Sequence, residues 1–104
     1  MERSKKRARA EPDGTGERDG QRLAIEIDNS GKMTVKKQMT AKWKRYEGFA
    51  GFVLVVAHDE SRMHRLRESA TEFRDISLLF TTFDRLRAGE PEPWVDWCGN
   101  KTAV

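Results

Sequence analysis

The sequence has a single cysteine, Cys98, so an internal disulfide framework is excluded. It also lacks any apolar run near the roughly 20 residues that a membrane-spanning helix needs. Its charged start has no apolar segment of the kind that opens a secretory signal. Glycine-rich loops with Walker spacing and serine or cysteine nucleophile arrangements are absent as well. We therefore expect a soluble, cytoplasmic protein with no membrane partner.

Positive charge is abundant and clustered. The chain has 104 residues, enough for one small domain, with 36% charged against 37% hydrophobic residues and a formal charge of +3. Five Lys/Arg and one acid lie in residues 1–9, and six Lys/Arg and no acid lie in residues 32–45. This clustering favours a face that binds a polyanion, although a solvated basic helix and a basic tail are the alternative. The candidate nucleic-acid contacts are Lys32, Lys36, Lys37, Lys44 and Arg45.

The chain divides into three segments by composition. Residues 1–11 have no apolar periodicity and predict a flexible basic arm, and residues 12–89 predict an α/β domain. Residues 90–104 are interrupted by proline and predict a C-terminal tail, which Trp94 and Trp97 tether to the body because large rings seldom stay free in solvent.

Hydrophobic periodicity predicts the order β-β-α-β-α-β, followed by one short helical turn. Such an order implies a small mixed sheet, largely parallel, with helices on its faces and an antiparallel hairpin at one side. In the second helix, Met63 and Leu66 form the apolar side and Arg62 is expected to point away from it. The predicted strands are a limb running into Asp13 and residues 22–28, 51–58 and 76–83; the predicted helices are 32–48 and 59–73, with the turn at 84–89.

Two carboxylates share one face of the strand at residues 22–28. Glu26 and Asp28 are two positions apart, hence roughly 6.5–7 Å apart along the backbone, and Asp13 could join them from the neighbouring limb. Clustered acids repel one another unless a cation lies among them. Mg²⁺ fits such a site, since it prefers oxygen ligands and exchanges its waters for phosphate oxygens. The alternative is a strand with acids exposed at its surface.

A lysine lies within the apolar stripe of the first predicted helix. At 100° per residue, with Val35 as zero, Lys42 falls at about −20°, between Val35 and Arg45, and Tyr46 falls at about +20°. An ammonium group facing the sheet needs an anionic partner, and Glu26 and Asp28 are the nearest acids. The alternative is a side chain that extends to the edge of the helix.

The motifs "PDG" (12–14), "AIEID" (24–28), "MTAKWKRY" (39–46) and "FVLVVAHDESRMHRL" (52–66) together resemble the C-terminal part of the replication-relaxation family, proteins of bacterial plasmids and mobile elements. That region in turn resembles the PD-(D/E)xK restriction-endonuclease-like fold, with its β-β-α-β core. The resemblance extends from about Pro12 to Leu86.

The resemblance implies a Mg²⁺-dependent DNA endonuclease. Asp13 matches the PD element and Glu26 the following acid, so Asp13, Glu26 and Asp28 become the implied metal ligands. The usual lysine position holds Asp28, and Lys42 on the next helix is the implied replacement. Many proteins of this fold dimerise, which adds a homodimer to the possibilities.

Two departures leave other functions open. Asp28 in place of lysine favours a catalytically inactive DNA-binding or replication accessory module. The winged-helix module and the leading helix of the family's pattern are missing from this sequence. A module that binds an acidic protein partner is a third alternative, based on charge alone.

Overall fold

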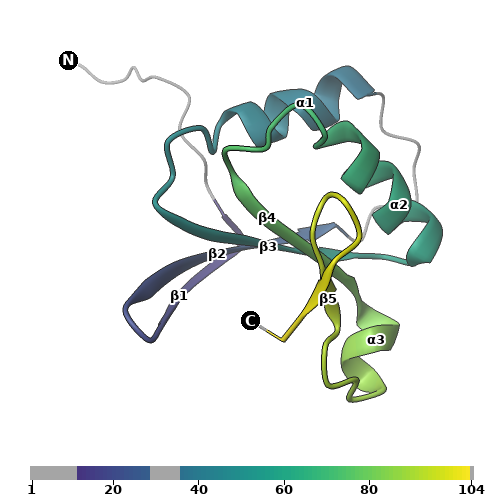
Figure 1. The fold of residues 1–104 in the computed structure, drawn as a ribbon. Helices are drawn as coiled ribbons and strands as arrows, with labels where there is room; N and C mark the ends of the chain where they lie inside the picture. Colours follow the sequence, from purple (N-terminus) through teal and green to yellow (C-terminus); the bar gives the residue numbers. More distant parts are fainter. Residues whose placement is uncertain (1–11, 29–35, 104) are drawn as a thin grey trace.

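The computed structural model describes residues 12–28 and 36–103, and side chains of residues 36–39 are not part of that description. The predicted mixed α/β fold is confirmed, with one six-stranded sheet and three helices in these described ranges (Figure 1). The basic arm, Lys32 and the start of the helix predicted at 32–48 lie outside the described residues. The elements are β1 (Gly14–Arg18), β2 (Gln21–Asp28), α1 (Lys36–Lys44), β3 (Gly51–Ala57), α2 (Glu60–Ser69), β4 (Ser77–Thr82), α3 (Phe83–Arg87), β5 (Trp94–Val95) and β6 (Lys101–Thr102).

The sheet has its strands in sequence order, from β1 to β6. β1 and β2 form an antiparallel hairpin, β2, β3 and β4 run parallel, and β5 and β6 are antiparallel additions. Asp19 and Gly20 make the hairpin turn with φ of 53° and 82°. Asp-Gly is favoured in two-residue hairpin loops because both positions require positive φ.

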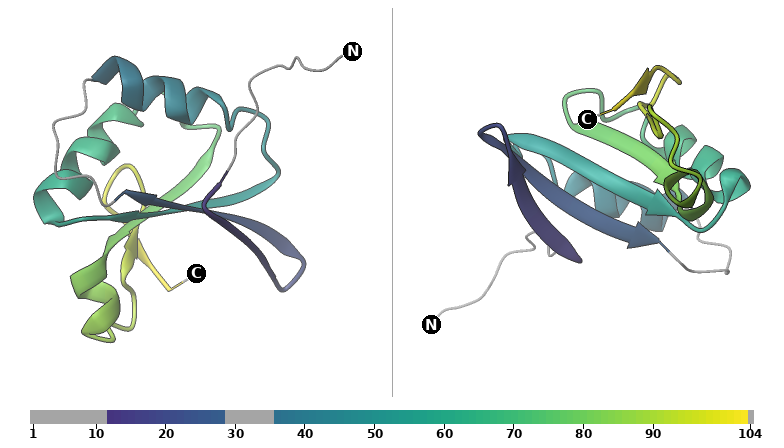
Figure 2. Two further views of the ribbon diagram at one scale, coloured as in Figure 1. Left: turned by 180° about the vertical axis from the view of Figure 1, so that it is seen from behind. Right: turned by 90° about the horizontal axis from the view of Figure 1, so that it is seen from below.

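Helices α1 and α2 cover the same face of the sheet, whereas α3 lies on the opposite side (Figures 1 and 2). The sequence pattern predicts helices on the sheet faces but does not distinguish one face from the other. The reason for the common face is topological. Crossovers between parallel strands are right-handed as a rule, and both crossovers advance in the same direction, from β2 to β3 to β4.

The core forms between this sheet face and the two helices. Trp43 of α1 is fully buried, with its ring edge-on to Phe80 of β4 at 5.9 Å between centroids. Its indole Nε1 donates to Ser69 Oγ of α2 at 2.7 Å. That bond satisfies the one polar atom of a ring that is otherwise apolar, and it links the two helices directly.

The C-terminal segment is attached to the sheet. Val95 in β5 is 4% exposed and pairs with Phe80, and the Thr81 hydroxyl donates to the Pro93 carbonyl at 2.6 Å. The Arg74 guanidinium stacks on the Trp97 ring at 4.8 Å. The predicted tethering of this segment is therefore observed, and it includes two short strands that periodicity did not reveal.

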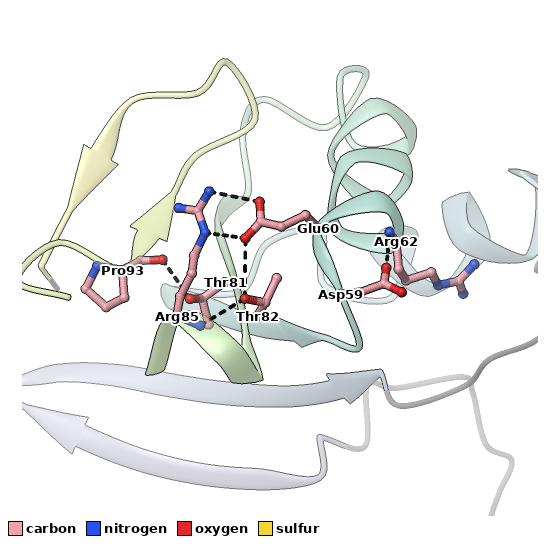
Figure 3. Close-up of polar contacts among 7 residues, drawn as sticks. All are labelled: Asp59, Glu60, Arg62, Thr81, Thr82, Arg85 and Pro93. Atoms are coloured by element: carbon pink, nitrogen blue, oxygen red, sulfur yellow. Dashed lines mark hydrogen bonds and ion pairs between the residues drawn. The ribbon is translucent and has the colours of Figure 1, made fainter. Parts of the chain in front are cut away.

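An ion pair fixes α3 to the start of α2 (Figure 3). Arg85 Nε lies 2.6 Å from Glu60 Oε2, and Thr82 caps α3 by accepting from the Arg85 backbone N–H at 3.1 Å. The hydrogen bond from Arg85 is the main cause that lowers the pKa of Glu60. Asp59 caps α2 in the same way, which starts the helix at Glu60. None of the helices in the described ranges is long and apolar enough to cross a membrane.

Gly51 is required where β3 enters the sheet. An added Cβ would lie 2.3 Å from the Arg22 carbonyl oxygen and 3.0 Å from the Phe49 ring. Arg22 is the register partner of Gly51, so its carbonyl cannot retreat without disturbing the β2–β3 ladder. We predict that Gly51→Ala lowers the free energy of unfolding by about 1–3 kcal/mol or more, the cost of overpacking, measured by urea denaturation.

Gly16 in β1 provides the matched control. A Cβ there meets its nearest neighbour, a Leu23 side-chain carbon, at 4.0 Å, so Gly16→Ala should be close to neutral. Equal effects of the two substitutions would show that space at Gly51 is not the constraint.

Candidate functional site

The acids of β2 are buried, whereas an isoleucine between them is exposed. Glu26 and Asp28 are 8% and 7% exposed, and Ile27 is 42% exposed. The alternation along the strand places the acids beside Ala24 on the face that α1 and α2 cover. The alternative of surface acids on an edge strand therefore does not apply, because β2 lies between β1 and β3.

Lys42 of α1 points to Glu26, as its angle on the helix predicts. Its Nζ lies 3.6 Å from Glu26 Oε1, and the lysine side chain is 37% exposed against 10% for the glutamate. Trp43 and Tyr46, the apolar neighbours in the same stripe, are buried. The ammonium group thus approaches the carboxylate from the solvent side.

Tyr46 is a site residue that the helical periodicity predicts only as part of the apolar stripe. Its hydroxyl donates to Glu26 Oε2, and the residue is 2% exposed. Burial, the hydrogen bond to Glu26 and the charges of Glu26 and Asp13 raise the pKa of Tyr46 far above its ordinary value. The hydroxyl therefore keeps its proton and remains a donor. Its spacing of four residues from Lys42 was the available signal.

Asp13 lies just before β1, beside the same end of the hairpin. Its Oδ2 accepts from the Ile27 backbone N–H at 2.8 Å. The register pairs Gly14 with Ile25, so Asp13 comes one step further along, opposite Glu26. Its charge contributes to the raised pKa of Tyr46, which agrees with this placement. Asp13 is exposed, unlike the acids of β2.

Asp28 belongs to a separate ion pair. Arg62 Nε of α2 lies 2.5 Å from Asp28 Oδ2, with side chains 10% and 8% exposed. The expectation that Arg62 points away from the apolar side of α2 is wrong. Arg62 adjoins Met63 at the border of the apolar stripe, and its long side chain reaches the sheet, where Asp28 compensates the cost of burying its charge.

The site thus brings together Asp13, Glu26, Lys42 and Tyr46, and leaves Asp28 apart. Among the described residues, no three His, Cys, Asp or Glu side chains are grouped as metal ligands. Two carboxylates nevertheless fit Mg²⁺, which is commonly held by one or two carboxylates together with waters and substrate phosphates. Asp13 and Glu26 are the two carboxylates of this site.

A groove of about 980 Å³ opens beside this site, which we call the polar corner. It lies between the β1–β2 hairpin and the turn that leads from α1 to β3, and Tyr46 contributes to both the groove and the site. Arg45, one of the predicted nucleic-acid contacts, lines the groove, and Lys44 is exposed nearby on α1. Lys36 and Lys37 belong to α1, but their side chains are outside the described part. The lining residues are Pro12, Thr15, Gly16, Glu17, Arg22, Leu23, Ala24, Arg45, Tyr46, Glu47, Gly48, Phe49 and Ala50.

Comparison with known proteins adds no relative: no family model, curated protein or solved structure matches this chain.

The buried pair of Asp28 and Arg62 yields a prediction about stability. We expect Arg62→Leu to lower the free energy of unfolding by about 3–5 kcal/mol, because it leaves a buried carboxylate without its cation. Urea denaturation measures the loss. The double variant Asp28→Leu/Arg62→Leu should recover part of it, since no charge then stays buried and unpaired.

Arg87→Leu is the matched control. Arg87 Nη2 and Asp84 Oδ1 are 2.7 Å apart, but their side chains are 73% and 81% exposed, so the loss should be about 0–1 kcal/mol. Similar losses for Arg62→Leu and Arg87→Leu would contradict the assignment of Asp28 to a structural pair.

Proposed function

We propose that this chain is a DNA-associated, nuclease-like domain of the plasmid or mobile-element replication and relaxation type, and that it cleaves DNA phosphodiesters with Mg²⁺. The observation that carries the proposal is the distance of 3.6 Å between Lys42 Nζ and Glu26 Oε1. It joins the lysine from α1 to the acid from β2, at the corner where Asp13 precedes β1.

The order of elements supports this assignment. β1, β2, α1 and β3 provide a hairpin, a helix and a parallel strand, which resembles the β-β-α-β core of the restriction-endonuclease-like fold. Asp13 directly before β1 and Glu26 within β2 support the match to the PD element and the following acid of that fold.

Each side chain has a role that follows from its geometry. Asp13 and Glu26 would hold the metal, and the metal would polarise the phosphodiester and lower the pKa of an attacking water. Lys42, partly exposed, offers its positive charge to the oxygens on which negative charge develops. The Tyr46 hydroxyl holds Glu26 Oε2 and so limits rotation of the carboxylate. Lys44, at the end of α1, and Arg45, in the turn after it, offer positive charge for contacts with backbone phosphates.

A specific observation favours a second candidate, a DNA-binding or replication accessory module without cleavage. Asp28 stands where the restriction-endonuclease-like pattern has lysine, and Arg62 already neutralises it. The site therefore has two acids available in place of three. Such a module binds DNA with steep salt dependence and needs no divalent cation.

Nicking of supercoiled plasmid in Mg²⁺ or Mn²⁺ distinguishes the two candidates. We predict that the wild-type protein nicks the plasmid and that EDTA stops the reaction. Glu26→Gln and Lys42→Met should each reduce the rate by about 10²–10³-fold, the usual cost of removing an electrostatic contact to the transition state. The exposed Glu72 and Lys101 lie outside the site, so Glu72→Gln and Lys101→Met serve as matched controls and should retain the wild-type rate.

Absence of nicking by the wild type with either metal, or nicking that survives Glu26→Gln, would refute the cleavage proposal. DNA binding in EDTA that weakens steeply with salt would then establish the second candidate. Affinity that does not change with salt would exclude both.

A further inference from the structure

The acid at the centre of the site is difficult for a large, rigid substrate to reach. Glu26 is 8% exposed and lies beneath Lys42 and Tyr46. The groove beside it shares Tyr46 with the site. A substrate segment that approaches Glu26 would therefore contact this groove. A single strand bends into such a recess more readily than a stacked duplex does.

The wall of the groove carries an aromatic ring that suits base stacking. Phe49 is half-buried and packs against the core, with its ring edge-on to Tyr46 at 5.8 Å between centroids. The Arg22 guanidinium lies 5.4 Å from the Phe49 ring centre. An aromatic ring beside an exposed arginine is a combination on which single-stranded bases stack, through the ring face and through cation–π contacts.

The charges of the groove are balanced. Arg22 and Arg45 contribute two cations, whereas Glu17 and Glu47 contribute two anions. A duplex presents two phosphate backbones at high charge density, which such a surface attracts weakly. One strand needs fewer cations: Arg45 is placed for a phosphate, while the bases gain contact with Phe49 and the neighbouring apolar side chains.

We infer that this groove binds a short single-stranded DNA segment, with a base stacked on Phe49 and the adjoining phosphate directed to the corner of Glu26 and Lys42. The inference rests on the proposed function and gives it a substrate class. It makes single-stranded regions, such as displaced strands or unpaired ends, the preferred DNA.

Fluorescence anisotropy in EDTA tests the inference with an oligonucleotide and its duplex of equal length. We expect the wild-type protein to bind the single strand at least about tenfold more tightly. Phe49→Leu should weaken that binding by about 5- to 150-fold, the range for loss of one base–aromatic stack. Phe49→Trp, which keeps a stacking ring, should retain it, and thermal unfolding of both variants verifies that they fold.

Arg45→Gln should in addition reduce the salt slope of single-strand binding by about 0.7, the contribution of one phosphate contact. Leu86→Ala is the control for Phe49→Leu, because Leu86 is an exposed apolar residue of α3 outside the groove.

Equal affinity for single strand and duplex, or a folded Phe49→Leu variant with unchanged affinity, would overturn the inference. Duplex binding and nicking that persist in that case leave the proposed function standing, whereas failure to bind either DNA refutes both.

Discussion

The burial of one carboxylate, that of Glu26, is the constraint on which the site depends. A charged group at 8% exposure is costly unless it has partners, and its two partners come from α1 and from the turn directly after it. Lys42 approaches Oε1 and Tyr46 donates to Oε2. These contacts fix the rotation of α1 about its axis, which also turns Trp43 into the core. The same arrangement thus orients the helix and assembles the polar corner.

The two acids of β2 are neutralised in different ways, and the difference decides what each can do. Asp28 is held by Arg62 in a pair that is buried on both sides, so solvent and ligands have little access to it. Glu26 pairs with a lysine that is 37% exposed and 3.6 Å away, so this pair is open to solvent on the lysine side. We therefore assign Asp28 to the stability of the fold, whereas the proposed chemistry depends on Glu26.

Sequence periodicity predicts those features that depend only on the direction in which a side chain leaves its strand or helix. Alternation along β2 placed Glu26 and Asp28 on one face, and the helical angle placed Lys42 toward the sheet; the structure agrees with both. Arg62 was misplaced because its length lets it reach a partner that its direction does not indicate. The Tyr46 hydroxyl was overlooked because its ring fits an apolar stripe equally well. β5 and β6 were not foreseen, since two-residue strands have no periodicity to detect.

Paramagnetic broadening by Mn²⁺ tests the central claim most directly, since carboxylate sites bind Mn²⁺ as well as Mg²⁺. In a titration followed by ¹H–¹⁵N NMR, the account predicts that the amides of Asp13, Gly14 and Ile27 broaden first. Those near Glu60 and Arg85, where an acid is already paired, should stay sharp until much higher Mn²⁺ concentrations. Glu26→Gln should abolish the early broadening. Broadening that begins elsewhere, or that Glu26→Gln leaves unchanged, would contradict the claim that Asp13 and Glu26 form a metal-binding corner.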